Sequence, residues 1–327
     1  MRGVLLIIPL VLFVSCKNEP CRESITPVKV ELKVERLERS LFDANSKEEV
    51  VGFLKDHDEF AKYFLSSDQY PSDAILANKL FTLFQNPSID TLFNEATKAF
   101  KNFDEFIKEL EGGYGRLKAY YPETNVPILQ TAVTGLAEGA DLYISNDRVI
   151  IGIDFFVGEK ATFKPLDIPN YILSRYTIDH LPGIILQFVS SQYVREGKND
   201  AMLSDMITYG KNYYLLSRLL PCTEERLLIG YSEAQWSDVF ENDKIIWANF
   251  IQNEWLYETN HTIKQKFMSE RPTVYEIGDK CPGRIGAWVG WQIVNAYMKN
   301  TESTIQELLA ETDHNKIFMQ SGYKPGS

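Results

Sequence analysis

The chain has 327 residues and a formal net charge of −11. This length allows one large hydrophobic core or two closely packed halves. The acidic balance argues against nucleic acid as a partner, because surfaces that bind nucleic acid are basic.

The N-terminus, MRGVLLIIPLVLFVSC, has the order of a bacterial lipoprotein signal. Arg2 is the positively charged start, and the apolar run over 3–14 is too short to span a bilayer comfortably. The run ends at Cys16, so we expect a signal peptide over 1–15 and a lipid on Cys16. An ordinary signal peptide or a short membrane anchor is the alternative.

Residues 16–27 are polar and contain two prolines, which predicts a flexible tether between the lipidated end and a folded domain over 28–327. No second apolar run of about 18 residues follows, so we expect a body held at the membrane through its lipid alone.

The pattern of the folded part changes along the chain. Hydrophobic residues alternate with charged residues over 28–35, which predicts a half-buried strand. Over 37–121, aromatic residues and leucines recur at spacings of three and four, which predicts helices with core-facing stripes. Three strands are then expected, over 128–135, 141–147 and 148–156, with the last buried on both faces and a tight turn at 145–147.

Four acidic residues accompany this sheet, but they lack the spacing of a calcium loop and are interpreted as turn and edge residues: Asp141, Asp147, Asp154 and Glu159. From residue 171 onward the pattern is mostly helical. The sequence SEAQ at 232–235 predicts a capping box that opens one long core helix reaching Trp255. The predicted fold is therefore α+β, a mostly helical single domain with a small β-sheet.

The most distinctive stretch is CPGRIGAWVGWQIVNAYM, over 281–298. Gly286 and Gly290 lie one turn apart on the predicted helix, and each costs about 1 kcal/mol of helix propensity. Close approach of another backbone would offset that cost. Arg284 and Gln292 are polar groups on this apolar helix, with a structural role or a place in a binding cleft as the two interpretations.

His180 stands in an apolar stretch that suggests a zinc-peptidase helix, which needs a second histidine one turn on and a glutamate directly after the first. Here those positions are Ile184 and Leu181, and Pro182 and Gly183 disturb a helix. We therefore expect His180 to pack in the core or to cap a helix, and we assign no metal ligands.

No nucleophile elbow, phosphate-binding loop or dinucleotide fingerprint occurs in the sequence, so no catalytic residue and no cofactor is assigned. Cys222 and Cys281 are the cysteines of the folded body, since Cys21 falls in the expected tether. They could form a disulfide in an oxidising envelope, or remain two separate buried thiols.

Several long stretches together resemble the gliding-motility lipoprotein GldB family: MITYGKNYYLLSRLLPCTEERLLIGYSEAQW, NDKIIWANFIQNEWLYETN, PGRIGAWVGWQIVNAYM and IFMQSGYKP. The resemblance covers essentially the whole mature chain. It implies a lipid-anchored envelope protein needed for surface gliding, whose machinery is linked to a dedicated secretion system. The outer membrane is favoured over the inner.

The GldB family is more distantly similar to predicted zinc metallopeptidases of the zincin type, in which a strand precedes the zinc helix and a downstream glutamate is the third ligand. This chain has the same order of parts, but Leu181, Ile184 and Tyr209 stand at the positions expected to bear catalytic groups. The resemblance therefore implies a degenerate zincin-like domain that has lost its metal chemistry.

These observations favour a protein that acts without catalysis by binding other envelope proteins of the gliding or secretion apparatus, and that meets the membrane through its N-terminal lipid. The alternative is an envelope hydrolase or peptidase-like enzyme that uses a remodelled zincin cleft. A third interpretation, a carbohydrate- or peptide-binding lipoprotein, rests on the aromatic content and would require exposed aromatic side chains in a groove.

Overall fold

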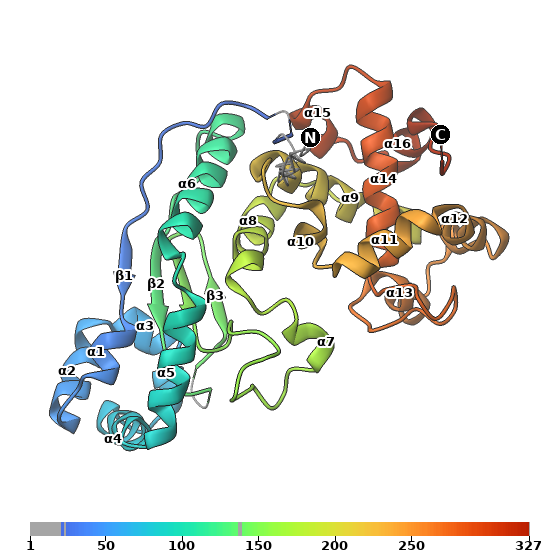
Figure 1. Cartoon of the computed structure of the whole chain (residues 1–327). Helices are drawn as coiled ribbons and strands as arrows, with labels where there is room; N and C mark the ends of the chain where they lie inside the picture. The colour runs from blue at the N-terminus through green and yellow to red at the C-terminus, as the bar shows by residue number, and fades with distance from the viewer. Residues whose placement is uncertain (1–20, 23, 137–138, 327) are drawn as a thin grey trace, which may run out of the picture.

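The computed structural model describes residues 21–22, 24–136 and 139–326, and its centre is a small mixed sheet (Figure 1). The strand order is β1-β2-β4-β3, in which β1, β2 and β4 are parallel and β3 runs antiparallel at one edge. The strands are β1 (Val34–Arg36), β2 (Ile128–Ala132), β3 (Leu142–Ile144) and β4 (Arg148–Gly152).

The helices between β1 and β2 divide over the two faces of the sheet: those up to residue 84 pack on one face, and the last two join the main core on the other. They are α1 (Glu38–Phe42), α2 (Lys47–Asp56), α3 (Asp58–Tyr63), η1 (Ser67–Gln69), α4 (Asp73–Phe84), α5 (Pro87–Ala99) and α6 (Phe103–Tyr120). Ala132 and Ile150 point from the sheet into a core that is shared with α1 to α4. The opposite face sends Leu129, Val149 and Ile151 into the main core.

The main core extends from this second face through the helices of the C-terminal half. They are α7 (Asn170–Leu173), η2 (Ile178–His180), α8 (Leu181–Ser191), α9 (Met202–Leu219), α10 (Glu225–Ile229), α11 (Glu233–Glu241), α12 (Asp243–Gln252), η3 (Trp255–Tyr257), α13 (His261–Met268), α14 (Ile285–Asn300), α15 (Ile305–Ala310) and α16 (His314–Ser321). α8 packs against α6 and α9, and α14 packs along α9. The fold is therefore α+β and mostly helical, as predicted.

The prediction that β4 is buried on both faces is confirmed, because Val149, Ile150 and Ile151 are fully buried. The turn before it is confirmed as well, with Ser145 and Arg148 hydrogen-bonded across it. The predicted strand over 28–35 is mostly wrong. Only Val34–Arg36 pairs with β2, and the residues before it run extended along α6, where the Val28 amide donates to the Gly115 carbonyl.

The expected long helix through Trp255 is broken. The Ser232–Gln235 capping box forms as predicted, but α11 ends at Glu241 and α12 begins at Asp243. Asn242 lies between them, and its side-chain amide donates to the Asp238 carbonyl at 2.7 Å. The break changes the direction of the apolar stripe, so Phe240 is 45% exposed.

Glycines make the close contact between α9 and α14. A Cβ added at Gly290 would lie 1.8 Å from the Met206 carbonyl oxygen, and one at Gly210 would lie 2.3 Å from the Gly290 carbonyl oxygen. The two backbones therefore touch directly, which confirms the close approach predicted for this helix. At Gly286 the near neighbour is instead a side chain, because an added Cβ would lie 2.5 Å from the sulfur of Met268 on α13.

Two buried polar side chains of α9 and α16 join the C-terminal segment to the core. The Lys211 ammonium donates to the Arg195 carbonyl at 2.9 Å and to the Glu311 carbonyl. His314 Nδ1 lies 2.9 Å from the Ser204 carbonyl oxygen. Burial lowers the pKa of Lys211 to about 8 and that of His314 to about 4.

Candidate functional site

His180 ends the short η2 turn and stands directly before α8. Pro182 therefore falls in the first turn of α8, where its missing N–H is not needed, and does not break a helix as the sequence suggested. The Nδ1 atom of His180 lies 2.8 Å from the Thr177 hydroxyl. His180 thus occupies the position before α8, but its side chain makes no capping hydrogen bond to the helix.

Three guanidinium groups surround His180. Burial, followed by the positive charges of Arg175, Arg226 and Arg284, lowers the pKa of His180 to about 4. The imidazole is therefore neutral near pH 7. A cation placed beside it would meet the same repulsion that disfavours its protonation.

The positions expected to carry metal ligands or a base carry other groups. Leu181 is fully buried in the core, Ile184 is partly exposed, and Tyr209 is 41% exposed. Within the described ranges, no group of three or more histidine, cysteine or acidic side chains could hold a metal ion. One imidazole among three guanidiniums does not fit the donor set of a catalytic zinc site.

Beside His180, a glutamate joins two arginines into a cluster that we call the arginine–glutamate cluster: Arg175, Glu270 and Arg284. One carboxylate oxygen of Glu270 accepts a hydrogen bond from Arg175, and the other lies 3.7 Å from an Arg284 nitrogen. Burial opposes ionisation of Glu270, but the Arg175 hydrogen bond and the neighbouring Arg284 charge outweigh it and lower its pKa. The arginine side chains are mostly buried, whereas Glu270 is 38% exposed.

The backbone is shaped to bring the two arginines together. Gly230 has a φ of 72°, and a Cβ there would lie 2.4 Å from Arg175 Cδ and 2.8 Å from Arg284 Nη2. Its carbonyl accepts a hydrogen bond from Arg284 at 3.3 Å. Glycine is therefore required on both conformational and steric grounds. The cluster borders a cavity of about 30 Å³, room for about one water molecule.

Arg284 itself is held in a strained conformation. It precedes α14 with a φ of 58°, in the left-handed region that costs a non-glycine residue of order 1 kcal/mol or more. Its amide donates to the Ser269 carbonyl at 2.9 Å, and the Tyr231 hydroxyl donates to the Gly283 carbonyl at 2.8 Å. These bonds fix the turn, so Arg284 is presented to Glu270 by a rigid segment.

Gln292 lies elsewhere, in a groove of about 510 Å³ between α14 and the C-terminal segment. Aromatic residues of this groove include Phe240, Trp288 and Tyr323, of which Trp288 is almost fully buried. The structure therefore brings His180 and Arg284 into one region and leaves Gln292 outside it. Most other large aromatic side chains belong to the core, which removes most of the basis for a sugar-binding interpretation.

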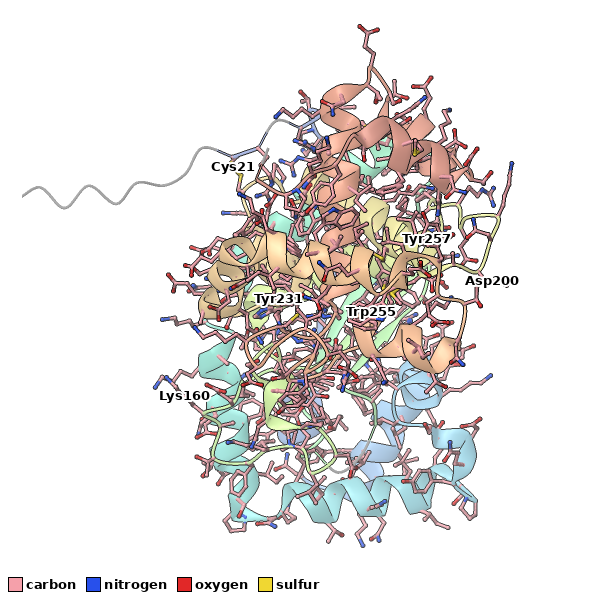
Figure 2. All side chains as sticks on the ribbon, turned by 90° about the vertical axis from the view of Figure 1, so that its right-hand side faces the viewer. Cys21, Lys160, Asp200, Tyr231, Trp255 and Tyr257 are labelled. Carbon is pink, nitrogen blue, oxygen red and sulfur yellow. A yellow bond between two sulfur atoms is a disulfide. The ribbon has the colours of Figure 1, made fainter. Side chains whose placement is uncertain are left out.

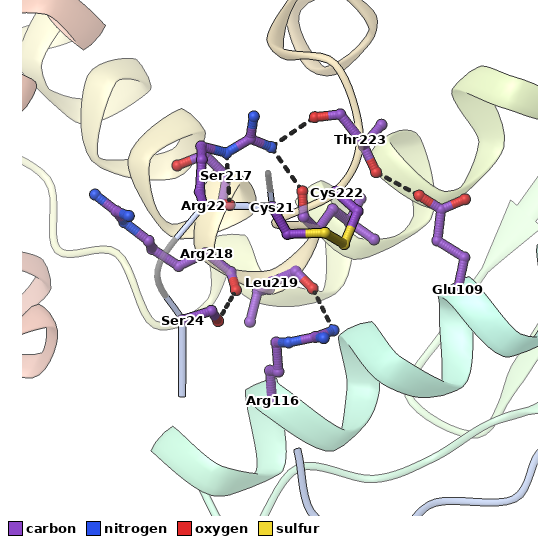
Figure 3. Close-up of a disulfide and its surroundings, with 11 residues drawn as sticks. Cys21, Arg22, Ser24, Glu109, Arg116, Ser217, Arg218, Leu219, Cys222 and Thr223 are labelled. Carbon is purple, nitrogen blue, oxygen red and sulfur yellow. Dashed lines mark hydrogen bonds between the residues drawn. A yellow bond between two sulfur atoms is a disulfide. The ribbon is translucent and has the colours of Figure 1, made fainter. Parts of the chain in front are cut away.

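The cysteine pairing differs from the one considered from sequence. Cys222 is bonded to Cys21, and Cys281 is a buried free thiol whose pKa is raised to about 12 by burial (Figure 3). The proposed Cys222–Cys281 disulfide is therefore wrong. Cys21 is part of the expected flexible tether, yet it is covalently fixed to the body. Cys16 lies outside the described residues.

Asp154 lies in the turn directly after β4, as the sequence suggested, but it is not at an exposed edge. It is buried, and its carboxylate accepts hydrogen bonds from the amides of Thr134 and Leu136 at 3.1 and 3.0 Å. Burial raises the pKa of Asp154 to about 6. Its role is to hold the loop after β2 against the loop after β4.

Sequence reasoning missed Arg175, Glu270 and Cys21 as members of these sites. Arg175 and Glu270 are far apart in sequence and belong to no spacing motif. Cys21 could have been found by considering it as a partner of Cys222, since an odd cysteine near an anchor in an oxidising compartment needs an explanation.

A family model described as "Gliding motility protein GldB" matches residues 18–325. The chain belongs to the GldB family. Membership in this lipoprotein family implies a lipid anchor in a membrane. No curated protein and no solved structure matches the chain. Within the described residues of this GldB family member, no helix is both long and apolar enough to cross a membrane.

Proposed function

We propose that this chain is a cell-envelope lipoprotein, lipidated on Cys16, that serves the gliding-motility machinery and its associated secretion system by binding other envelope proteins, without catalysis. Family membership over residues 18–325 supports the process. The signal-like sequence over 1–15 supports the anchor, with the outer membrane favoured.

A degenerate zincin-like domain is part of this proposal. The order β4, α8, α9 and α14 follows the order of parts in the predicted zinc metallopeptidases, and the antiparallel edge strand β3 contacts α8. The residues that would hold zinc there do not fit a metal, as described above. The helix has been kept while the groups around it have become arginines and aliphatic residues.

The observation that carries the binding proposal is the arginine–glutamate cluster beside His180. One carboxylate faces two guanidiniums, which leaves the triad with a net positive charge inside a chain of net charge −11. Arginine binds carboxylates in a bidentate geometry, and rigid presentation lowers the entropic cost of binding. A partner segment that bears a carboxylate is the ligand that this chemistry favours.

The alternative is a hydrolase that uses a carboxylate or tyrosine cluster in a remodelled cleft, in which His180 would be the histidine available as a general base. A base whose pKa is about 4 abstracts protons poorly at neutral pH, because efficient general bases titrate near the working pH. The neighbouring Thr177 hydroxyl orients the ring but supplies no charge to raise that pKa. The cluster therefore favours recognition over proton transfer.

The test is complementation in a gliding bacterium that carries this gene. Arg175→Gln removes one charge from the cluster, and Lys280→Gln is the matched control, since Lys280 is 77% exposed and pairs only with Asp238 at 3.6 Å among the described residues. We expect Arg175→Gln to reduce colony spreading and partner cross-linking while its membrane level and melting temperature stay near those of the control. Normal spreading and cross-linking by the Arg175 variant would refute the proposed contact.

Elemental analysis of the purified full chain, prepared without added zinc, tests the non-catalytic part. Near-stoichiometric zinc would contradict it. Metal-free purified protein, from a gene that restores spreading in the complementation test, would agree with a non-catalytic role.

A further inference from the structure

The N-terminal segment is fastened to the body at its first described residue. Cys21 is bonded to Cys222, which lies in the loop between α9 and α10 (Figure 3). The Arg22 amide donates to the Pro221 carbonyl at 2.9 Å. The Arg22 side chain donates to the carbonyls of Leu220 and Thr223 at 2.7 and 2.6 Å. The disulfide and the Arg22 side chain, whose positive charge caps the carboxyl end of α9, therefore hold the same loop over 220–223.

The loop that receives this segment is itself held by α6. The Thr223 hydroxyl donates to the Glu109 carboxylate, and Arg116 donates to the Leu219 carbonyl at 3.1 Å (Figure 3). Ser24 donates to the Arg218 carbonyl on the other side. The attachment point is therefore part of the rigid body.

Covalent geometry then limits how far this point can lie from the lipid. Four residues lie between Cys16 and Cys21, so the chain makes five steps, and at about 3.6 Å per extended step the maximum is roughly 18 Å. Without the disulfide and the hydrogen bonds of Arg22 and Ser24, the next backbone bond to the body would be that of Val28 to Gly115. The maximum would then rise to about 43 Å over twelve residues.

The surface next to Cys21 has the chemistry of a membrane contact. Ile25 is 36% exposed and Val28 is 48% exposed, on the segment that directly follows the disulfide. Lys29, also exposed, adds a positive charge beside them. Apolar side chains flanked by a cation suit the boundary between headgroups and acyl chains.

We propose that the edge formed by the Cys21–Cys222 disulfide, Ile25 and Val28 is the surface that faces the lipid bilayer, and that the disulfide fixes the orientation of the body on it. The end formed by α4 and α5 then faces away from the membrane, since Figure 2 draws these helices, in pale blue and cyan, at the opposite end of the molecule from Cys21. This inference rests on the proposed lipidation of Cys16 and is independent of the proposed partner contact.

The experiment uses the full lipidated chain in phosphatidylcholine vesicles that contain a nitroxide-labelled lipid. A genetically encoded fluorescent amino acid replaces either Glu224, exposed beside the disulfide, or Asn78, exposed on α4. We expect severalfold stronger quenching at position 224 than at position 78. In a second chain, Cys21→Ser, Cys222→Ser and Arg22→Pro together remove the disulfide and both the backbone and side-chain hydrogen bonds of residue 22, and quenching at 224 is expected to fall toward the value at 78.

Vesicle flotation separates this inference from the anchor on which it rests. A chain that fails to float overturns the lipid anchor, and the orientation with it. A chain that floats but is quenched equally at both positions overturns the orientation alone. Unchanged quenching at 224 in the released triple variant would refute the role of the disulfide, and the melting temperature of that variant shows whether its body is still folded.

Discussion

Replacing Gly290 by alanine tests the contact between α9 and α14 directly. The new Cβ would lie 1.8 Å from the Met206 carbonyl oxygen and 2.3 Å from its carbon, whereas real Cβ contacts stay beyond about 3.0 Å. The neighbour is backbone, so no side chain can rotate away. The two helices must separate by more than 1 Å, which loosens the packing of the buried Trp288 and Trp291.

Overpacking of this kind costs about 1–3 kcal/mol and more where backbone must move. The better helix propensity of alanine returns about 1 kcal/mol. We therefore expect Gly290→Ala to lower the free energy of unfolding by about 2 kcal/mol, measured by urea titration of the purified protein followed by circular dichroism.

Gly52 provides the matched control, because it also lies inside a helix but a Cβ added there would have no atom within 4 Å. Gly52→Ala should raise the free energy of unfolding by about 0.5–1 kcal/mol. If both variants were stabilised to a similar degree, the direct backbone contact between α9 and α14 would be wrong.

Three further changes probe buried polar groups by the same titration. Burial raises the pKa of Asp154 to about 6, so the folded state retains this proton above pH 4 and its stability falls as the pH rises from 4 to 6. Asp154→Asn keeps an acceptor for the Thr134 amide. Its free energy of unfolding should exceed that of the parent by about 1–2 kcal/mol at pH 7 but not below pH 4. A constant difference across that range would contradict this assignment. Burial lowers the pKa of His314 to about 4, so the unfolded chain binds the proton first and stability is lost as the pH falls from 6.5 to 4. His314→Asn can still donate to the Ser204 carbonyl and should flatten that pH dependence. An equally steep loss in the variant would show that His314 is not its source. Lys211→Met leaves two partly buried carbonyls without this donor and should cost about 2 kcal/mol at pH 7. An unchanged urea midpoint would show that these bonds add nothing.

Local patterns predicted the local features of this fold. The strands of the sheet after residue 128, the Ser232 capping box and the close approach at Gly290 all follow from residues that are neighbours in sequence. The family was also recognisable from the sequence, and the family match agrees with it.

Features that depend on distant residues could not be predicted in this way. Arg175 meets Arg284 only because Gly230 lets both guanidiniums approach one carboxylate, and no periodicity encodes that encounter. The helix break at Asn242 interrupts an apolar pattern that runs on without change through the sequence, so the pattern does not predict it. The Cys21–Cys222 pair was missed because the residues around Cys21 have the composition of a linker.

The Cys21–Cys222 bond also decides where mechanical force would enter the body. A pull between the membrane and a partner bound elsewhere would pass from the anchored end through Cys21 directly into the loop after α9, which α6 braces through Arg116. The segment from Arg22 to β1 would then lie outside the line of tension. The three-residue β1, which is paired only along β2, is thereby shielded from being peeled off the sheet.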